Sequence, residues 1–190
     1  QEADMEQVNG RVKEQSKVRL LVIMAMLVAV CGVCAQVSIP MPIGVPFTLQ
    51  TLAVMIIALI LPPKWAGVTL LVYLGAGCVG LPVFAQAKAG IGAFFGPTGG
   101  FLWGFLPAAI CISYLAKGST LTWKRGILAC VAGMVITYAL GVIQLSFVSQ
   151  ISLGQAFVVG ALPYLPLEVV KVVLAIKIGQ IARKRNLIHF

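Results

Sequence analysis

Six apolar runs dominate the chain between residues 18 and 181, and short basic, proline-rich or glycine-rich segments separate them. Several runs approach the ~20 residues that an α-helix needs to cross the hydrocarbon core of a bilayer. The pattern therefore predicts an all-α integral membrane protein with six transmembrane helices, at residues 18–37, 47–61, 66–80, 98–116, 126–148 and 161–181. The second and third runs are short, so those helices are expected to recruit flanking residues such as 43–46, to tilt or break, or to thin the bilayer locally.

The composition supports the membrane assignment. Hydrophobic residues make up 60% of the 190 positions, charged residues make up only 10%, and the mean hydropathy is +1.02. Soluble domains carry about 25% charged residues. No linker, low-complexity tract or internal repeat divides the chain. We therefore expect a cytoplasmic tail at residues 1–16 and a single transmembrane domain at residues 17–190.

Basic residues predict the orientation in the membrane. Lys and Arg precede the first run, follow the second and fourth runs and close the sixth, whereas Lys88 alone lies on the opposite side. Trp65 and Trp123 stand beside Lys64 and Lys124, where an interfacial aromatic belt is expected, and the positive-inside rule places both termini in the cytoplasm. The net charge of +9 fits this topology better than nucleic-acid binding, because the basic residues form no stripe with interleaved aromatic residues.

A competing interpretation takes residues 18–34 as a secretory signal peptide with a cleavage site at Ala35. A basic region precedes this run and small residues follow it, as in such peptides. The run is long for the apolar part of a signal peptide, and five further apolar runs follow it, which favours a permanent helix.

One ion pair is distinctive because it lies inside an apolar run. Glu168 is the only acidic residue after Gln15, and Lys171 follows three positions later within residues 162–176. On a helix the two side chains share a face, and burying one charge in a membrane costs roughly 2.5–3.5 kcal/mol on insertion scales. We expect a ligand site in which Glu168 accepts hydrogen bonds and Lys171 donates one or meets a carboxylate. The alternative is a self-satisfied ion pair that fixes the register of the helices.

The remaining chemistry of the sequence argues against an enzyme and against a metal centre. The only histidine, His189, lies next to the terminus, and the apolar runs contain no Ser–His pair, paired carboxylates or cluster of metal ligands. Cys31 and Cys34 have CxxC spacing without other ligands, which is typical of packing in an apolar helix. The sequence has no phosphate-binding P-loop. We therefore expect no cofactor, and the energy for any transport must come from partners or from a gradient.

Two loops on the face opposite most of the basic residues are expected to cover a pocket. Residues 38–46 contain three prolines and no charge, and residues 81–97 are rich in glycine and alanine. Proline fixes φ and glycine allows close approach of the backbone, so both loops are expected to hold defined shapes as lids, although each such residue alone can simply end a helix. Spacings of four also predict close helix contacts, at Ala25 and Ala29 and at Gly96, Gly100 and Gly104.

Four segments together carry a family resemblance that extends over nearly the whole chain beyond the N-terminal tail. They are Val45-Pro-Phe-Thr-Leu-Gln-Thr51, Gly80-Leu-Pro-Val-Phe84, Gly96-Pro-Thr-Gly-Gly100 and Pro166-x-Glu168-x-x-Lys171. With these segments the chain resembles the BioY family, the biotin-specific S components of energy-coupling-factor (ECF) transporters. The resemblance implies a six-helix S-component bundle in a prokaryotic plasma membrane. It also implies capture of extracellular biotin, which is delivered across the membrane with a transmembrane coupling subunit and two cytoplasmic ATPases.

The resemblance assigns residues as well. In the family the acidic residue and the lysine of the last helix belong to the vitamin site, and they correspond to Glu168 and Lys171; an AxxxA pattern that meets the coupling subunit corresponds to Ala25 and Ala29. Glu168 departs from the aspartate that is common in the family. We hypothesise that Glu168 accepts the ureido N–H groups of biotin and that Lys171 meets its carbonyl oxygen or else its valerate carboxylate. Further expected pocket residues are Thr48, Gln50, Phe84, Gln86 and Tyr164.

Residues 85–90, Ala-Gln-Ala-Lys-Ala-Gly, depart further from the family. Relatives usually have a glycine-rich, arginine-containing loop at this place. Backbone hydrogen bonds that require glycine torsions are therefore not expected here, and Gln86 and Lys88 are candidates for side-chain contacts instead.

Two other functions stay open at this point. A proton- or ion-coupled secondary carrier with Glu168 as the relay would show uptake that collapses with an uncoupler while cellular ATP is held constant. An S component for another vitamin, such as thiamin or riboflavin, would share the fold, but the Pro-Val-Phe and Gly-Pro-Thr-Gly-Gly segments argue against it.

Overall fold

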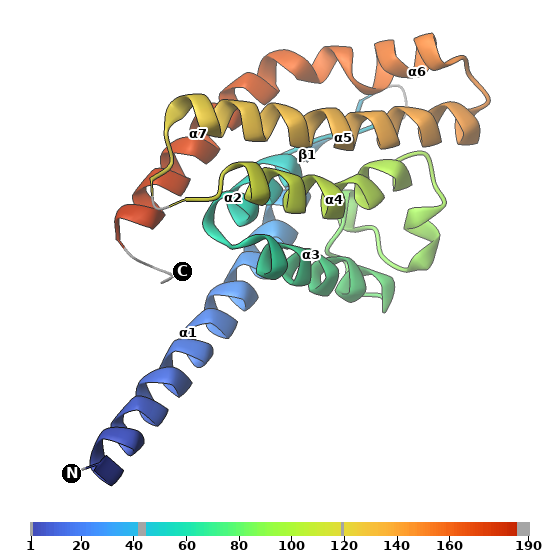
Figure 1. Ribbon diagram of the computed structural model, residues 1–190. Helices are drawn as coiled ribbons and strands as arrows, with labels where there is room; N and C mark the ends of the chain where they lie inside the picture. Colours follow the sequence, from blue (N-terminus) through green and yellow to red (C-terminus); the bar gives the residue numbers. More distant parts are fainter. Residues whose placement is uncertain (1, 42–44, 119, 186–190) are drawn as a thin grey trace.

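The computed structural model describes residues 2–41, 45–118 and 120–185, with side chains from Glu14 onward. Part of the expected 38–46 loop, at residues 42–44, lies outside the described residues, as do His189 and the side chains of Arg11 and Lys13. Over the described part the protein is a helical bundle with one small pair of strands (Figure 1). The first helix leans away from the other helices towards the N-terminus (Figure 1).

Seven α-helices and three 3-10 helices build the described part of the bundle. The last two α-helices and the 3-10 helix between them form one helical stretch, Leu153–Lys184, so the helices group into six segments that correspond to the six predicted runs. The predicted all-α, six-helix fold is confirmed. The elements are α1 (Glu2–Gln36), α2 (Gln50–Ile60), α3 (Pro63–Cys78), η1 (Ala85–Ala87), η2 (Ile91–Phe94), α4 (Gly99–Leu115), α5 (Trp123–Ser149), α6 (Leu153–Gly160), η3 (Leu162–Tyr164) and α7 (Leu165–Lys184).

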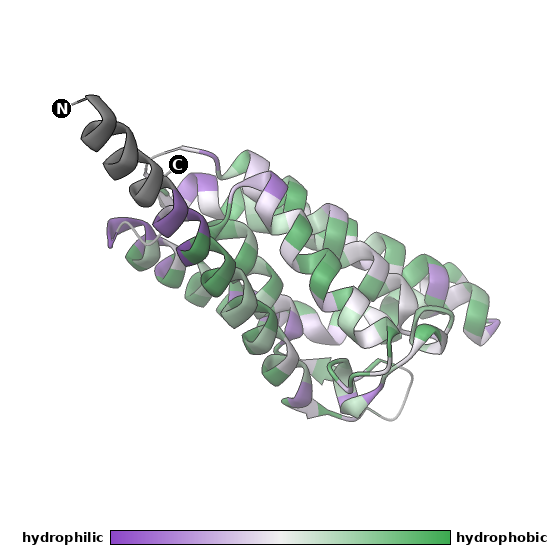
Figure 2. Ribbon diagram, turned by 90° about the horizontal axis from the view of Figure 1, so that it is seen from below, coloured by the Kyte–Doolittle hydropathy of each residue, from purple (hydrophilic) through white to green (hydrophobic). Residues whose placement is uncertain are grey.

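Three helical stretches of the described residues are long and apolar enough to cross a membrane by length and composition: Glu14–Gln36, Trp123–Ser149 and Leu153–Lys184. Gln50–Ile60 and Gly99–Leu115 are shorter apolar helices. Apolar residues cover much of the visible helix surface (Figure 2), and many of the exposed large side chains are leucine, valine and isoleucine. This surface is typical of a protein whose solvent is lipid, whereas the orientation of the bundle in the membrane stays a prediction.

The second apolar run differs from its prediction at its start. Residues 47–61 were expected to be helical throughout, but Phe47–Thr48 form strand β2, which pairs antiparallel with β1 (Ser38–Ile39). The helix α2 begins only at Gln50 and has 11 residues. Most of its side chains are buried, and it packs against α1, α3, α4, α5 and α7. A helix enclosed by other helices has no need to span the bilayer by itself.

One helix was missed by the sequence prediction. Residues 153–160 lie between the fifth and sixth runs, and they form α6. Ser152 begins this helix with a capping box, in which its hydroxyl accepts from the Gln155 backbone and the Gln155 side chain accepts from the Ser152 backbone. The Ser-x-x-Gln spacing is a recognised start signal for a helix, so this element was detectable in the sequence.

Two small residues of α4 allow α4 and α5 to pack closely, as their spacing predicted. A Cβ added at Gly104 would lie 2.8 Å from the Thr137 backbone, and one added at Gly100 would lie 2.9 Å from the Gly141 Cα. Real Cβ atoms do not approach backbone atoms this closely. The third predicted position, Gly96, meets nothing closer than 3.7 Å, so only Gly100 and Gly104 are required for the contact.

Candidate functional site

A cavity opens at the end of the bundle where α2, α4 and α7 begin. Counting its open mouth, the cavity has about 640 Å³ of empty space. Its walls come from the start of α2, the loop between α3 and α4, the middle of α5 and the start of α7. The lining residues include Val45, Thr48, Gln50, Thr51, Phe84, Lys88, Thr98, Phe101, Leu102, Phe105, Tyr138, Tyr164, Glu168 and Lys171.

Glu168 and Lys171 form the polar, buried end of this cavity. Lys171 Nζ lies 2.8 Å from Glu168 Oε1, and the two residues are only 4% and 1% exposed, respectively. The chain places them there because η3 ends at Tyr164 and Pro166 occupies the first turn of α7, where proline needs no backbone donor. Glu168 then falls in the first turn, where the helix dipole stabilises a negative charge.

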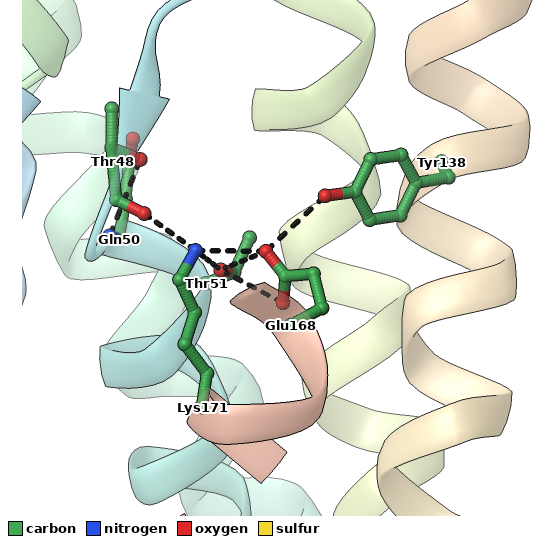
Figure 3. A network of polar contacts seen from close by, with 6 residues as sticks. All are labelled: Thr48, Gln50, Thr51, Tyr138, Glu168 and Lys171. Atoms are coloured by element: carbon green, nitrogen blue, oxygen red, sulfur yellow. Dashed lines mark hydrogen bonds and ion pairs between the residues drawn. The ribbon is translucent and has the colours of Figure 1, made fainter. Parts of the chain in front are cut away.

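Side chains from α2 and α5 complete the ion pair (Figure 3). The Thr51 hydroxyl donates to Glu168 Oε1 at 2.9 Å and Oε2 at 3.3 Å, and it accepts from Lys171 Nζ at 2.9 Å. The Tyr138 hydroxyl donates to Glu168 Oε1 at 3.2 Å. Lys171 Nζ also donates to the Thr48 carbonyl at 2.6 Å. Partners from two helices, α2 and α5, and from strand β2 therefore hold the pair, which fixes the position of both charges.

The two partners of the ion pair differ in what they can still bind. Lys171 makes hydrogen bonds to three acceptors, which uses all three protons of its ammonium group. Glu168 Oε1 accepts from three donors, whereas Oε2 has only the 3.3 Å contact with Thr51. Since each carboxylate oxygen can accept about two hydrogen bonds, Oε2 is the atom that is best able to accept another donor.

Aromatic rings flank the charged end. The Lys171 ammonium lies 4.4 Å from the centroid of the Phe47 ring, and Phe47 stacks on Tyr164 with ring centroids 6.4 Å apart. The Tyr164 hydroxyl donates to the Val45 carbonyl, which ties the start of α7 to the segment before β2. Phe101 meets Tyr138 edge to face. The rings of Phe101, Tyr138 and Tyr164 line the cavity and give it apolar surface that suits a ligand with an apolar body and a few polar groups.

Tyr73 on α3 anchors the loop between α3 and α4, which forms one wall of the cavity. The Tyr73 hydroxyl accepts from Gln50 Nε2 at 2.6 Å and donates to the Val83 carbonyl at 2.8 Å. The neighbouring Phe84 ring packs edge to face on Tyr73 and lies so close to Gly77 that no side chain fits at position 77. Gln50 and Phe84 both line the cavity, so their contacts with Tyr73 set the shape of one wall.

Gln36, at the end of α1, anchors the same loop from the side. Its Nε2 donates to the Pro82 carbonyl at 3.1 Å and the Phe84 carbonyl at 3.0 Å, and its Oε1 accepts from the Ala87 N–H at 3.0 Å. Together with Tyr73, this side chain binds three consecutive carbonyl groups, those of residues 82–84. The loop is thus tied to α1 and to α3.

One prediction about the backbone torsions of this loop was wrong. Torsions that favour glycine were not expected in residues 85–90, yet Gln86 and Ala87 have φ values of 60° and 55°. Such left-handed torsions cost a non-glycine residue roughly 1–2 kcal/mol. The hydrogen bond from the Ala87 N–H to Gln36 compensates part of this cost. The backbone shape is therefore obtained without glycine at these two positions.

The structure brings six of the predicted pocket residues together around one cavity. These are Thr48, Gln50, Phe84, Tyr164, Glu168 and Lys171. The seventh, Gln86, is exposed and does not line the cavity, although Ala85 and Lys88 on either side of it do. The two alanines predicted for partner contact, Ala25 and Ala29, are exposed on α1 and lie outside the cavity.

Two members of the polar network were not among the predicted site residues. Thr51 lies in the first turn of α2, whereas Thr48 belongs to strand β2, so helical spacing did not link the two residues. Tyr138 gave no signal in the sequence: it is one tyrosine in a long apolar run, and only the packing of α5 against α7 places its hydroxyl 3.2 Å from Glu168.

Comparison with known proteins places this arrangement among characterised folds. Residues 6–187 match the sequence profile of the BioY family. The chain is 38% identical over 158 residues to "Biotin transporter BioY" of Thermotoga maritima, covering 83% of this chain and 91% of that one. It is 32% identical over 176 residues to "Biotin transporter BioY2" of Lactococcus lactis subsp. cremoris, covering 93% and 96%. The fold matches a crystal structure of the S-component for biotin from an ECF-type ABC transporter, with a TM-score of 0.84, 27% identity and coverage of 90% and 93%.

Proposed function

The chain belongs to the BioY family, and on that premise we propose that it binds biotin in the cavity at the start of α7 and serves as the S component of an ECF transporter. The observation that carries the proposal is a closed hydrogen-bond network around Glu168 and Lys171 at the buried end of a cavity that also has aromatic walls and a second cation, Lys88. Biotin has a polar ureido ring, an apolar thiophane ring and a charged valerate chain, and the cavity offers partners of each kind in that order.

The ureido ring of biotin is placed at the buried end. It offers two N–H donors and one carbonyl acceptor. Glu168 Oε2 has capacity to accept an N–H, and Lys171 can turn one of its three N–H groups from a protein acceptor towards the ureido carbonyl. The neighbouring Phe47 and Tyr164 rings would flank the fused apolar ring system.

The valerate carboxylate is placed near the mouth, beside Lys88. Lys88 is exposed and, apart from Lys171, is the only cation among the residues that line the cavity. Because Lys171 is already bonded to Glu168, Thr51 and Thr48, a second carboxylate at the buried end would compete with these partners. Lys88 has no such competition among the contacts of the described residues, so the carboxylate is favoured there.

ATP-driven transport would require partners that hydrolyse ATP, because this sequence contains no phosphate-binding P-loop. We place the protein in the prokaryotic plasma membrane with a transmembrane coupling subunit and two cytoplasmic ATPases, with both termini on the cytoplasmic side. Ala25 and Ala29 are exposed on one stretch of α1, and small residues with this spacing allow another helix to approach closely. This stretch is the proposed contact with the coupling subunit.

Isothermal titration calorimetry with the purified protein tests the site. Glu168→Ala removes the carboxylate that would accept a ureido N–H, and a hydrogen bond to a charged group contributes roughly 1.5–3 kcal/mol, so we expect biotin affinity to fall by roughly 10- to 150-fold. Lys171→Ala should also weaken binding but by a smaller factor, because Lys171 is already bonded to three protein acceptors. Lys177→Ala, an exposed change on the same helix, is the matched control and should bind like the parent. Parent-like affinity in both site variants would refute the assignment of the site.

Two further measurements separate the proposed function from its alternatives. In a thermal-shift panel of vitamins, biotin should stabilise the parent protein and thiamin and riboflavin should not, because ligand that binds only the native state raises the melting temperature. Uptake in cells should follow ATP rather than the proton gradient. Uptake that collapses with an uncoupler while ATP is held constant would instead favour a gradient-driven carrier.

A further inference from the structure

A second cavity lies at the opposite end of the same helices. Counting its open mouth, it encloses about 700 Å³. The helices α2, α4 and α7 begin at the proposed biotin cavity, and the second cavity lies where these helices end. It is lined by Leu61 and Pro62 after α2, Ser113 and Lys117 at the end of α4, and Arg183 in the last turn of α7. The two cavities share no lining residue.

The second cavity is positively charged. Lys117 and Arg183 line it and no carboxylate does. Among the side chains described from Glu14 onward, the only carboxylates are those of Glu14 and Glu168, and Glu168 is bonded to Lys171 in the biotin cavity. Nearby, Arg125 adds a third cation, whose Nη1 donates to the Lys117 carbonyl at 3.1 Å. Lys117, Arg125 and Arg183 form no ion pair with a carboxylate of the described residues.

Hydrogen bonds fix the position of Arg183, but some of its N–H donors have no acceptor among the described residues. Its Nε donates to the Leu59 carbonyl at 2.9 Å, and its Nη1 donates to the carbonyls of Ala116 and Gly118, each at 2.9 Å. These bonds satisfy the carboxyl ends of α2 and α4 and orient the guanidinium. The Nη2 group makes no hydrogen bond to any described residue, and it keeps two N–H donors for a ligand. A fixed guanidinium with free donors is suited to phosphate.

The other walls of the cavity are apolar. Leu61, Pro62 and Pro63 line it, and the α3 helix begins at Pro63 without a side-chain cap, which leaves its positive end free to face an anion. Lys64 lies over the Trp65 ring at 5.3 Å, an arrangement that is typical of the boundary between hydrocarbon and water. A ligand here meets cations on one side and apolar surface on the other.

We propose that this second cavity binds the headgroup of an anionic phospholipid, with its phosphate between Lys117 and Arg183 and an acyl chain along Leu61, Pro62 and Pro63. A basic pocket between helices at the membrane boundary is the kind of site that binds acidic lipid headgroups. The apolar wall favours a lipid over a free anion, because a soluble phosphate would leave that wall without a contact.

Native mass spectrometry of the detergent-purified protein tests the proposal. The probes are phosphatidylglycerol and, as the zwitterionic comparison, phosphatidylcholine. We expect the parent to retain one tightly bound phosphatidylglycerol. Lys117→Glu should lower that affinity by roughly fivefold or more, since one basic residue near a membrane surface contributes about that factor. Lys124→Glu is the matched control, because Lys124 is exposed near the same end of the bundle but does not line the cavity.

Each outcome decides the proposal. Selective loss in Lys117→Glu, with biotin affinity by calorimetry unchanged, supports it and separates this site from the biotin site. Equal loss of phosphatidylglycerol binding in Lys117→Glu and Lys124→Glu, or equal retention of phosphatidylglycerol and phosphatidylcholine by the parent, refutes a specific lipid site in this cavity. Complete displacement of phosphatidylglycerol by millimolar glycerol phosphate would reassign the site to a soluble anion. Parent-like lipid binding in Lys117→Glu combined with failure to co-purify with the coupling subunit would show that the cavity holds a protein partner and that the lipid assignment is wrong.

Discussion

Replacing Gln36 by alanine should loosen the loop that forms one wall of the proposed biotin cavity. The side chain of Gln36 reaches from the end of α1 to the backbone of Pro82, Phe84 and Ala87 at distances of 3.0–3.1 Å. Phe84 is buried and lines the cavity, so a change in its backbone is transmitted directly to the site. The substitution leaves the network of Glu168 and its partners untouched.

The size of the effect follows from these three hydrogen bonds. Each hydrogen bond contributes roughly 0.5–1.5 kcal/mol net, and the low end applies here because Gln36 is exposed and water can replace it. The loss of about 1–2 kcal/mol corresponds to an increase of roughly 5- to 30-fold in the Kd for biotin. The left-handed torsions of Gln86 and Ala87 should also relax once the bond to Ala87 is removed.

The assay is calorimetry for Kd combined with stopped-flow measurement of biotin release. We expect faster release of the ligand and a small change in melting temperature, because Gln36 itself is exposed. Gln36→Glu should be at least as severe, since a carboxylate cannot donate to the two carbonyls. Gln150→Ala removes a single side-chain bond, to the Phe147 carbonyl at the end of α5, and is the matched control. Parent-like Kd and release rate in Gln36→Ala would show that the loop does not depend on this side chain.

Three other substitutions give distinct outcomes. Thr51→Val keeps the side-chain shape but removes the hydroxyl that bonds to Glu168, so it should weaken biotin binding by roughly tenfold or more in calorimetry, at about 1.5–3 kcal/mol for a bond to a charged group. Gly77→Ala inserts a methyl group into the Phe84 ring and should lower the melting temperature, at about 1–3 kcal/mol for overpacking, whereas Gly75→Ala meets nothing and should not. Lys88→Ala should weaken binding of biotin but not of its uncharged methyl ester; equal effects on both ligands would move the carboxylate away from Lys88.

Much of the fold was predictable because the membrane makes the apolar pattern unusually informative. Each of the six runs corresponds to a helical segment, since a chain in lipid must satisfy its backbone hydrogen bonds within the helix. The helix prediction was wrong at residues 47–48, where a neighbouring strand satisfies the backbone hydrogen bonds. Phe47 and Thr48 are apolar enough to extend the second run, but β1 supplies their backbone partners. Hydropathy alone does not distinguish these two ways of satisfying the backbone.

The site was predictable only in the part that a single helix determines. Glu168 and Lys171 lie three positions apart on α7, and their pairing follows from helical geometry. A buried ammonium needs three acceptors, and Glu168 supplies one, so the sequence requires two further acceptors without identifying them. They come from Thr48 and Thr51, more than a hundred residues earlier in the chain. Only the packing of α2 against α7 brings them within reach, and the same packing makes Lys171 fully bonded before any ligand arrives. Biotin must therefore compete with protein acceptors for Lys171 but not for Glu168 Oε2, which predicts that Glu168 dominates the affinity.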